Sequence, residues 1–374
     1  MARCIIVVMD SVGIGALPDA QAYGDALQVN TVGNTAQHLG GLALPNFAAL
    51  GLGALTRIQG VADQPSLPSR IARMGEASAG KDTITGHWEM AGIVTNVAFP
   101  TFPHGFPPDV IAAFTDICGG KAPLGNCAAS GTEILAELGE LHMQTGRPIL
   151  YTSADSVFQV AAHEQVVPVE TLYTWCNAAR AWLDGPYRVN RVIARPFLGK
   201  PGAFVRTANR HDFAVEPPDN MLDQLAAQHI PVHGVGKISD IFSGRGLTSS
   251  TRVADNDEGV AATLHLLDTV GHGCIFTNLN DFDSKYGHRR DVRGYGMALE
   301  RLDTQLPSLL QRLRTDDVLI ITADHGCDPT APGSDHTREY VPFLACGAVE
   351  AAQLGDVWGF ELVAATVTAT LLPT

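Results

Sequence analysis

The sequence lacks the paired cysteines that mark a disulfide framework or a zinc ribbon. Its seven cysteines are odd in number and widely scattered, and no two of them form a CxxC pair. This usage is typical of proteins in a reducing compartment. We therefore expect neither disulfide bonds nor a zinc ion held by cysteine thiolates.

Long apolar runs are also missing. The first run, residues 4–9, ends at Asp10 and is too short for the core of a secretory signal peptide. No other stretch approaches the length of about 20 apolar residues that a membrane-spanning helix needs. These absences predict a soluble, cytoplasmic protein without a membrane partner.

Positive charge is scarce. The chain has 25 Lys and Arg residues against 39 Asp and Glu residues, which gives a formal net charge of −14. This excess of negative charge argues against nucleic acid or an anionic membrane surface as a partner. A phosphorylated substrate would need local cations to hold it, and bound divalent metals could supply that charge.

Size and composition indicate a folded protein with two domains. The chain has 374 residues, of which 45% are hydrophobic and 17% charged, and this length exceeds what one hydrophobic core usually supports. Proline-rich segments at residues 99–108 and 215–218 are typical of linkers. We predict a core made of residues 1–98 and 218–374, with a smaller α/β cap domain, residues 99–217, inserted into it.

Three short runs rich in β-branched residues each end in polar side chains. Residues 4–9 lead to Asp10, residues 274–277 lead to Asp281 and Asp283, and residues 318–321 lead to Asp324 and His325. Runs that are apolar on both faces suit central strands of a parallel sheet, where ligands bind beyond the carboxyl ends of the strands. We predict an α/β fold with a mostly parallel sheet and one shared crevice. Helices are expected over residues 257–270 and 296–314, the second broken at Pro307.

Three aspartates and three histidines lie at or near these strand ends. They are Asp10, Asp283, His288, Asp324, His325 and His336. Singly, Asp10 could form an Asx turn, and Asp324 with His325 could be a structural pair. Together they suffice for two metal ions that clamp the attacking and leaving oxygens of a phosphoryl transfer. Mixed carboxylate and imidazole ligands suit manganese or zinc better than calcium or magnesium.

A nucleophile is available in the segment GKDTITGHWE, residues 80–89. Thr83 and Thr85 both precede a predicted helix. A metal-bound threonine at such a position could attack phosphorus, whereas ordinary helix capping is the alternative function for either hydroxyl. The pattern does not choose between the two threonines.

Long segments throughout the chain resemble one known family. The segments are VVMDSVGIG, GKDTITGHWEMAG, ASGTEIL, YTSADSV, RVIARPF, NRHDFA, GKISDIF, DFDSKYGHRRD, ITADHGCDP and DHTREYVP. In this order they are similar to the phosphopentomutases, which belong to the alkaline-phosphatase-like superfamily. The resemblance runs from the first strand to about residue 347.

The resemblance implies a reaction and a set of roles. The family interconverts α-D-ribose 1-phosphate and D-ribose 5-phosphate, and also the 2-deoxyribose pair, through a phosphothreonine and a bound bisphosphate. It implies two manganese ions, one held by Asp10, Asp324 and His325 and the other by Asp283, His288 and His336. Thr83 would carry the phosphate. The implied sugar-phosphate contacts are Ser153, Asp155, Arg191 and Arg206 in the cap and Lys237 in the core. Arg191 and Arg206 have a simpler alternative, which is pairing with surface carboxylates.

Other functions share parts of this pattern. A cofactor-independent phosphoglycerate mutase or a phosphomonoesterase of the same superfamily would have the same metal ligands, but the motifs YTSADSV and RVIARPF favour the pentose enzyme. A protein whose metals only hold the fold would usually show a closed, thiolate-rich site and would have no use for Thr83. Zinc and manganese both fit the ligands, and no pattern in the sequence bears on the oligomeric state.

Overall fold

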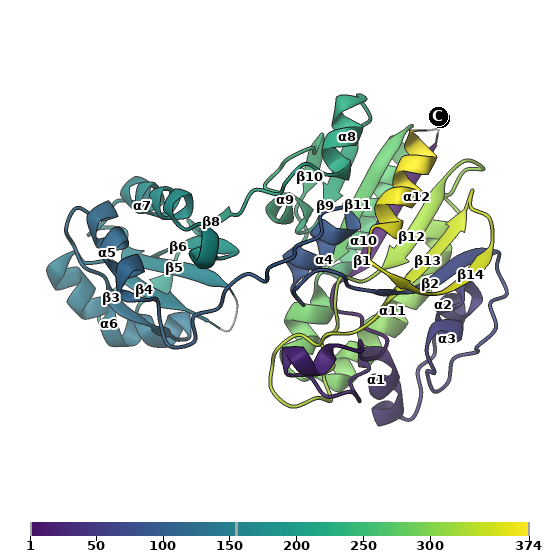
Figure 1. Cartoon of the computed structure of the whole chain (residues 1–374), viewed down its shortest axis with the longest axis horizontal. Helices are drawn as coiled ribbons and strands as arrows, with labels where there is room; N and C mark the ends of the chain where they lie inside the picture. Colours follow the sequence, from purple (N-terminus) through teal and green to yellow (C-terminus); the bar gives the residue numbers. More distant parts are fainter. Residues whose placement is uncertain (1, 154–155, 373–374) are drawn as a thin grey trace. The chain divides into compact units, whose positions relative to one another are not determined.

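The computed structural model describes residues 2–153 and 156–372. The chain divides into two compact units, one formed by Met1–Ala98 with Pro217–Thr374 and the other by Phe99–Glu216. Each unit has its own sheet (Figure 1). The two units are therefore described separately.

The first unit is built on a mixed sheet. Its strands are β1 (Arg3–Met9), β2 (Ser69–Gly75), β9 (Val232–Val235), β10 (Ser249–Thr251), β11 (Gly273–Leu279), β12 (Val318–Thr322), β13 (Val341–Gly347) and β14 (Ala352–Trp358). Within the described residues the strand order is β10-β9-β11-β1-β12-β13-β2-β14. Neighbours from β10 to β12 run parallel, as do β2 and β14, whereas β13 is antiparallel to both of its neighbours. The mostly parallel sheet predicted from the sequence is confirmed.

Helices cover both faces of this sheet. They are α1 (Thr31–Leu39), α2 (Pro45–Leu50), α3 (Leu52–Leu55), α4 (Thr83–Met90), α8 (Met221–Ala227), α9 (Ile238–Ile241), α10 (Asn256–Thr269), α11 (Val292–Leu310) and α12 (Leu362–Leu371), with the short turns η1 (Ala20–Tyr23) and η3 (Phe282–Gly287). Strand β11 shows the two faces, because Phe276 stacks on His87 of α4, whereas Thr277 contacts Thr263 of α10 through their hydroxyls at 2.7 Å. Successive side chains of a strand point to opposite faces, so α4 and α10 lie on opposite sides of the sheet. In the described part of the chain, no helix has both the length and the apolar character to span a membrane.

The three runs expected to be strands lie next to one another at the centre of the sheet. Strand β1 pairs in parallel with β11 on one side and with β12 on the other (Figure 1). Every residue of these three strands is buried. Burial on both faces explains why their sequences read as continuous apolar runs. Because the strands are parallel neighbours, their carboxyl ends meet at one edge of the sheet.

Of the two predicted helices, one agrees closely with the structure and the other needs a correction. Helix α10 is shifted by one residue from the expected range, and α11 begins at Val292 and ends at Leu310, in each case four residues before the expected position. Asp291 caps α11 by accepting the Gly294 N–H at 2.8 Å. The expected break at Pro307 is wrong, because Pro307 lies inside the helix. Proline leaves the carbonyl four residues earlier without its helical donor, and the Asn46 side chain donates to that carbonyl, of Asp303, at 3.0 Å.

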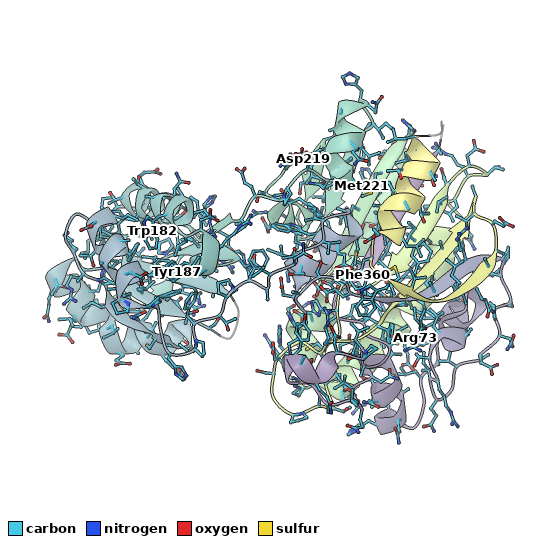
Figure 2. All side chains as sticks on the ribbon, viewed as in Figure 1. Arg73, Trp182, Tyr187, Asp219, Met221 and Phe360 are labelled. Atoms are coloured by element: carbon cyan, nitrogen blue, oxygen red, sulfur yellow. The ribbon has the colours of Figure 1, made fainter. Side chains whose placement is uncertain are left out.

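The second unit is a smaller α/β fold. Its elements are α5 (Pro108–Ile117), β3 (Leu124–Ala128), α6 (Gly131–Thr145), β4 (Ile149–Thr152), β5 (Val157–His163), α7 (Val169–Trp182), η2 (Gly185–Tyr187), β6 (Arg191–Leu198), β7 (Val205–Arg206) and β8 (His211–Ala214). The described strands follow the order β3-β4-β5-β6-β7, with β8 also paired to β6. Along β5, Phe158 and Val160 join one buried apolar cluster and Ala161 joins another. At the end of α7, Trp182 stacks on Tyr187 with ring centres 6.0 Å apart (Figure 2).

Candidate metal centre

Acidic and imidazole side chains gather where the central strands of the first unit end. Asp10 follows β1, Asp283 lies in the π-helical turn η3 after β11, and His288 follows that turn. Asp324 and His325 follow β12, and His336 lies in the segment between β12 and β13. All are buried except His288, which is partly exposed. The structure therefore brings the six predicted ligands to one edge of the sheet.

Asp10, Asp324 and His325 form one group. Nε2 of His325 lies 3.6 Å from Oδ1 of Asp10 and 3.4 Å from Oδ2 of Asp324. These two buried oxygens accept no hydrogen bond from any residue within the described ranges. A buried carboxylate oxygen without a donor is costly unless a cation neutralises it. This group therefore fits a metal ion.

Asp283, His288 and His336 lie equally close together. Oδ1 of Asp283 is 3.2 Å from Nε2 of His336, and Oδ2 is 3.3 Å from Nε2 of His288. The two imidazole nitrogens are 3.1 Å apart. Two nitrogens and a carboxylate that converge in this way are typical metal ligands.

The other ring nitrogen of each histidine contacts a main-chain carbonyl. Nδ1 of His288 lies 2.7 Å from the Ser334 oxygen, Nδ1 of His325 lies 3.0 Å from the Gly326 oxygen, and Nδ1 of His336 lies 2.9 Å from the Lys81 oxygen. A carbonyl oxygen only accepts, so Nδ1 carries the hydrogen in each ring. The lone pair of each neutral ring then lies on Nε2, the nitrogen that faces the carboxylates. This arrangement of outer hydrogen bonds is typical of metal-binding histidines.

The ligand atoms form overlapping groups of three within 4.8 Å. Among the described residues these are Asp10–Asp324–His325, Asp283–His325–His336 and Asp283–His288–Cys327. His325 belongs to two groups and so links the two sides of the centre. Cys327 lies within reach of Asp283 and His288. Its thiol is buried, and burial raises its pKa well above the ordinary value.

Burial and mutual repulsion strongly perturb the acids and the imidazoles. Burial, helped by the neighbouring Asp324 carboxylate, raises the pKa of Asp10 to about 7. Burial also acts to raise the pKa of Asp324, but the imidazoles of His325 and His87 outweigh it and lower the value to about 2. Burial lowers the pKa of His325 to about 4. Divalent cations would relieve the repulsion between these carboxylates, so the centre fits divalent metal ions.

Helix α4 places its two threonines differently. Asp82 caps the helix, and its carboxylate accepts the Ile84 N–H at 3.1 Å and the Thr85 hydroxyl at 2.5 Å. The Thr85 hydroxyl is thus hydrogen-bonded to the capping residue, and Thr85 is buried. Oγ1 of Thr83 instead lies 3.2 Å from Nε2 of His325. The Thr83 hydroxyl therefore faces the metal centre.

Steric constraints explain why residue 86, in helix α4, is a glycine. A Cβ atom at Gly86 would lie 2.3 Å from the main-chain oxygen of Asp324. No side chain fits there, so glycine allows α4 to pack directly on the segment that carries the metal-ligand candidates. This close packing keeps Thr83 next to His325.

The predicted sugar-phosphate contacts are distributed over both units. Lys237 lies in the first unit, with Nζ 3.8 Å from Oδ2 of Asp10. Ser153, Arg191 and Arg206 lie in the second unit, and Asp155 lies outside the described residues. Arg191 pairs with Asp212 at 3.4 Å, as the simpler alternative for this residue expects, and Arg206 is exposed on β7.

Two further residues lie at the metal centre but were not predicted from the sequence to be part of it. His87 is fully buried, with Nδ1 3.2 Å from Oδ2 of Asp324, and Asn278 donates to Asp10 at 2.9 Å. The only sequence signals were a histidine four residues after Thr83 and a polar residue within the apolar strand β11. Neither signal indicates which side chain the residue would contact.

Known proteins resemble this chain over nearly its whole length. A sequence model described as the metalloenzyme superfamily matches residues 2–372. The phosphopentomutase of Anaeromyxobacter sp. (strain Fw109-5) is 56% identical over 343 residues, which cover 91% of this chain and 88% of that protein. The phosphopentomutase of Caldanaerobacter subterraneus subsp. tengcongensis is 52% identical over 368 residues, which cover 98% and 93%.

A solved structure extends the comparison to the fold. The PH0037 protein from Pyrococcus horikoshii matches with a TM-score of 0.54 and 13% identity, covering 100% of this chain and 98% of that one. This likeness concerns the fold, and it agrees with the α/β core and mostly parallel sheet predicted from the sequence. With more than half of its residues identical to curated relatives over most of its length, the chain belongs to the phosphopentomutases, isomerases of the metalloenzyme superfamily.

Proposed function

We propose that the chain interconverts α-D-ribose 1-phosphate and D-ribose 5-phosphate, and also the 2-deoxyribose pair, with Thr83 as the phosphate carrier. The observation that supports this most directly is the position of the Thr83 hydroxyl beside His325, which belongs to the ligand group of Asp10 and Asp324 and also to that of Asp283 and His336. The alternative carrier, Thr85, has its hydroxyl bound to the Asp82 carboxylate.

The six acidic and imidazole side chains would hold two divalent ions, which we propose to be manganese. They would be sorted as Asp10, Asp324 and His325 for one ion and Asp283, His288 and His336 for the other. Bound ions supply positive charge to the transferring phosphoryl group. The three donor-free carboxylate oxygens of Asp10, Asp283 and Asp324 among the described residues support this assignment.

Each half of the reaction exchanges one P–O bond for another. The bond between phosphorus and Thr83 breaks as phosphorus bonds to the free hydroxyl of a sugar monophosphate, which gives a bound bisphosphate. The other phosphoryl group then passes to Thr83 and leaves the isomeric monophosphate. No water is consumed, so the enzyme must bind both phosphates while excluding water.

We propose that five side chains hold the sugar phosphate, namely Ser153, Asp155, Arg191, Arg206 and Lys237. Guanidinium and ammonium groups are the usual partners of phosphate oxygens. The chain as a whole carries a net charge of −14, so such local cations are needed to hold an anionic substrate. Replacing any one of these cations by Ala should raise KM for the sugar phosphate more than it lowers kcat.

We also propose a cytoplasmic location for this enzyme. All seven cysteines are free thiols. Free thiols persist in compartments kept reducing by the cell, which supports this location.

The test uses the manganese-loaded enzyme and ribose 5-phosphate. After incubation and digestion, the peptide that carries Thr83 should gain the mass of one phosphate, and coupled assays should detect ribose 1-phosphate. Phosphate on Thr85, or turnover of 3-phosphoglycerate alone, would overturn the proposal. Release of inorganic phosphate without isomerisation would indicate a phosphomonoesterase instead.

A further inference from the structure

A chain of polar contacts connects the first metal-ligand group to the main chain of Thr83. Nδ2 of Asn278 donates to Oδ2 of Asp10 at 2.9 Å and lies 3.2 Å from Nε2 of His87. Nδ1 of His87 lies 2.8 Å from the main-chain oxygen of Thr83 and 3.2 Å from Oδ2 of Asp324. His87 thus stands between the two carboxylates and the proposed phosphate carrier.

The chemistry of the partners fixes the direction of each hydrogen bond. The Thr83 carbonyl only accepts, so Nδ1 of His87 carries a hydrogen and donates it. The Asp10 carboxylate accepts from the Asn278 amide nitrogen, because the opposite amide orientation would place two oxygens against each other. The second hydrogen of that nitrogen then points to Nε2 of His87, which accepts it. Both nitrogens of the His87 ring are therefore occupied, and His87 is not a candidate metal ligand.

Packing leaves the His87 ring little freedom. The residue is fully buried, and its ring stacks on Phe276 with centres 5.9 Å apart and planes inclined by 23°. Helix α4 is further fixed on the same face by the Trp88 indole, which donates to the Ile241 carbonyl at 3.1 Å. The ring therefore cannot turn away from Thr83 without breaking buried hydrogen bonds.

We propose that His87 is a positioning residue that, together with Asn278, fixes Thr83 relative to Asp10 and Asp324. The inference rests on the proposed role of Thr83 and adds that His87 must hold Thr83 in position for phosphoryl transfer. The contacts act on the main chain of the carrier and on the orientation of two carboxylates, so His87 affects both phosphoryl transfer and metal affinity. Small displacements of a reacting group cost up to about 100-fold in rate, and lost outer contacts typically cost about 10- to 100-fold in metal affinity.

Three substitutions separate hydrogen bonding from packing. His87→Phe keeps a ring that can stack on Phe276 but removes both polar contacts. His87→Asn places its amide nitrogen at the position of Nδ1, because both atoms are bonded to Cγ, and so restores the donor to Thr83. Trp88→Phe is the matched control, since it removes one buried hydrogen bond from the same helix without touching Thr83 or a carboxylate.

The measurements are kcat and KM of the manganese-loaded enzyme, and the affinity of the metal-free enzyme for Mn²⁺ by calorimetry. His87→Phe should lower kcat by about 100-fold with little change in KM, and should weaken the binding of Mn²⁺ by about 10-fold. His87→Asn should recover most of both losses. Trp88→Phe should lower the melting temperature while kcat stays within about threefold of the wild type. Circular dichroism confirms that each variant is folded.

Specific outcomes would overturn the inference. It fails if His87→Phe retains kcat and Mn²⁺ affinity, or if His87→Asn and His87→Phe are equally impaired, because the ring would then serve packing alone. If His87→Phe does not fold, the comparison of His87→Asn with Asn278→Leu decides, because both variants keep the donor to Thr83 and only Asn278→Leu removes the hydrogen bond to Asp10. Asn278→Leu should then bind Mn²⁺ more weakly than His87→Asn, and equal Mn²⁺ affinities of the two variants would overturn the inference. Failure of the proposed function would appear separately, as a wild-type enzyme that never gains phosphate on Thr83.

Discussion

The Thr83 hydroxyl lies 3.2 Å from Nε2 of His325, although 242 positions separate the two residues in the sequence. Helix α4 supplies one partner and the end of β12 the other. Gly86 makes the contact possible, because only a residue without a side chain lets α4 approach the main chain of Asp324 so closely. The hydroxyl and the metal-ligand candidates are thus brought together by backbone packing rather than by a flexible loop.

Thr83 and Thr85 should respond differently to substitution by alanine. Thr83→Ala should abolish isomerisation and leave the melting temperature nearly unchanged, because its hydroxyl faces the metal centre. Thr85→Ala loses a hydrogen bond to the Asp82 carboxylate and should destabilise the fold by about 1.5–3 kcal/mol while turnover persists. Steady-state assays and urea unfolding check both expectations.

Thr83→Ser serves as the control for the carrier, since it keeps the hydroxyl and removes only a methyl group. It should retain measurable turnover and should still gain phosphate from substrate. Turnover in Thr83→Ala would exclude Thr83 as the carrier. Loss of turnover in Thr85→Ala without loss of stability would transfer that role to Thr85.

Removal of divalent metal should lower the melting temperature. Asp10 and Asp324 are buried in the same ligand group, so without a cation their charges repel each other in the folded state. A metal present at 100 times its Kd stabilises the fold by about 2.7 kcal/mol per site. Calorimetric scans with EDTA and with added Mn²⁺ measure the difference.

Asp10→Asn provides the matching control for the metal effect. It removes the carboxylate whose pKa burial and the neighbouring Asp324 raise to about 7, so the melting temperature without metal should rise while the gain from Mn²⁺ becomes smaller. An equal melting temperature with EDTA and with Mn²⁺ in the wild type would contradict the assignment of the centre as a metal site.

Arg338 should be essential for the stability of the segment that leads to α4. Its buried guanidinium donates to the Glu76 carboxylate at 2.8 Å, and to the main-chain oxygens of Ser78 at 2.8 Å and Gly80 at 2.6 Å. Arg338→Met would leave the Glu76 carboxylate buried without its cation. We expect a loss of about 3–5 kcal/mol in the free energy of unfolding, measured with urea.

The double variant Glu76→Leu with Arg338→Met tests whether the buried charge is the cause. Removing both partners avoids an uncompensated charge, so the double variant should be more stable than Arg338→Met alone. If the double variant is as unstable as the single one, the lost contacts to the main-chain oxygens of the segment explain the effect instead.

Sequence reasoning predicted the centre of the fold because its physical signal is local. Strands β1, β11 and β12 are buried on both faces, so each reads as an apolar run that ends in a polar residue. The expected break at Pro307 is wrong because Asn46 donates to the Asp303 carbonyl that the proline leaves without a donor, and Asn46 and Asp303 are 257 positions apart. A proline removes a helical hydrogen bond locally, but only the tertiary fold shows whether another donor replaces it.

Part of the candidate site could also be predicted from the sequence. Its six acidic and imidazole residues follow or lie near strand ends, which is where parallel sheets bring side chains together. His87 and Asn278 could not be assigned, since their contact joins α4 to β11 across 191 positions. The choice between Thr83 and Thr85 also required structure, because both hydroxyls suit the same helix start and only their partners differ.

His142 should make the protein less stable in mild acid. Its ring is fully buried in the second unit, with Nδ1 donating to the Arg147 carbonyl at 2.6 Å and Nε2 accepting the His163 N–H at 2.8 Å. Burial lowers the pKa of His142 below the ordinary value of 6.5. The unfolded chain therefore takes up a proton that folded His142 resists, so stability is full above about pH 6.5 and falls as the pH decreases towards the folded pKa.

Urea unfolding at about pH 7.5 and about pH 5.5 measures this loss, and His142→Gln supplies the control. Glutamine does not titrate, so the variant should start less stable than the wild type but should lose less stability on acidification. The two pH dependences should differ by on the order of 1 kcal/mol across this interval. Equal pH dependences in the wild type and the variant would show that His142 gains its proton as readily in the folded state as in the unfolded chain. The structure opposes this, because a protonated Nε2 can no longer accept the hydrogen bond from the His163 N–H.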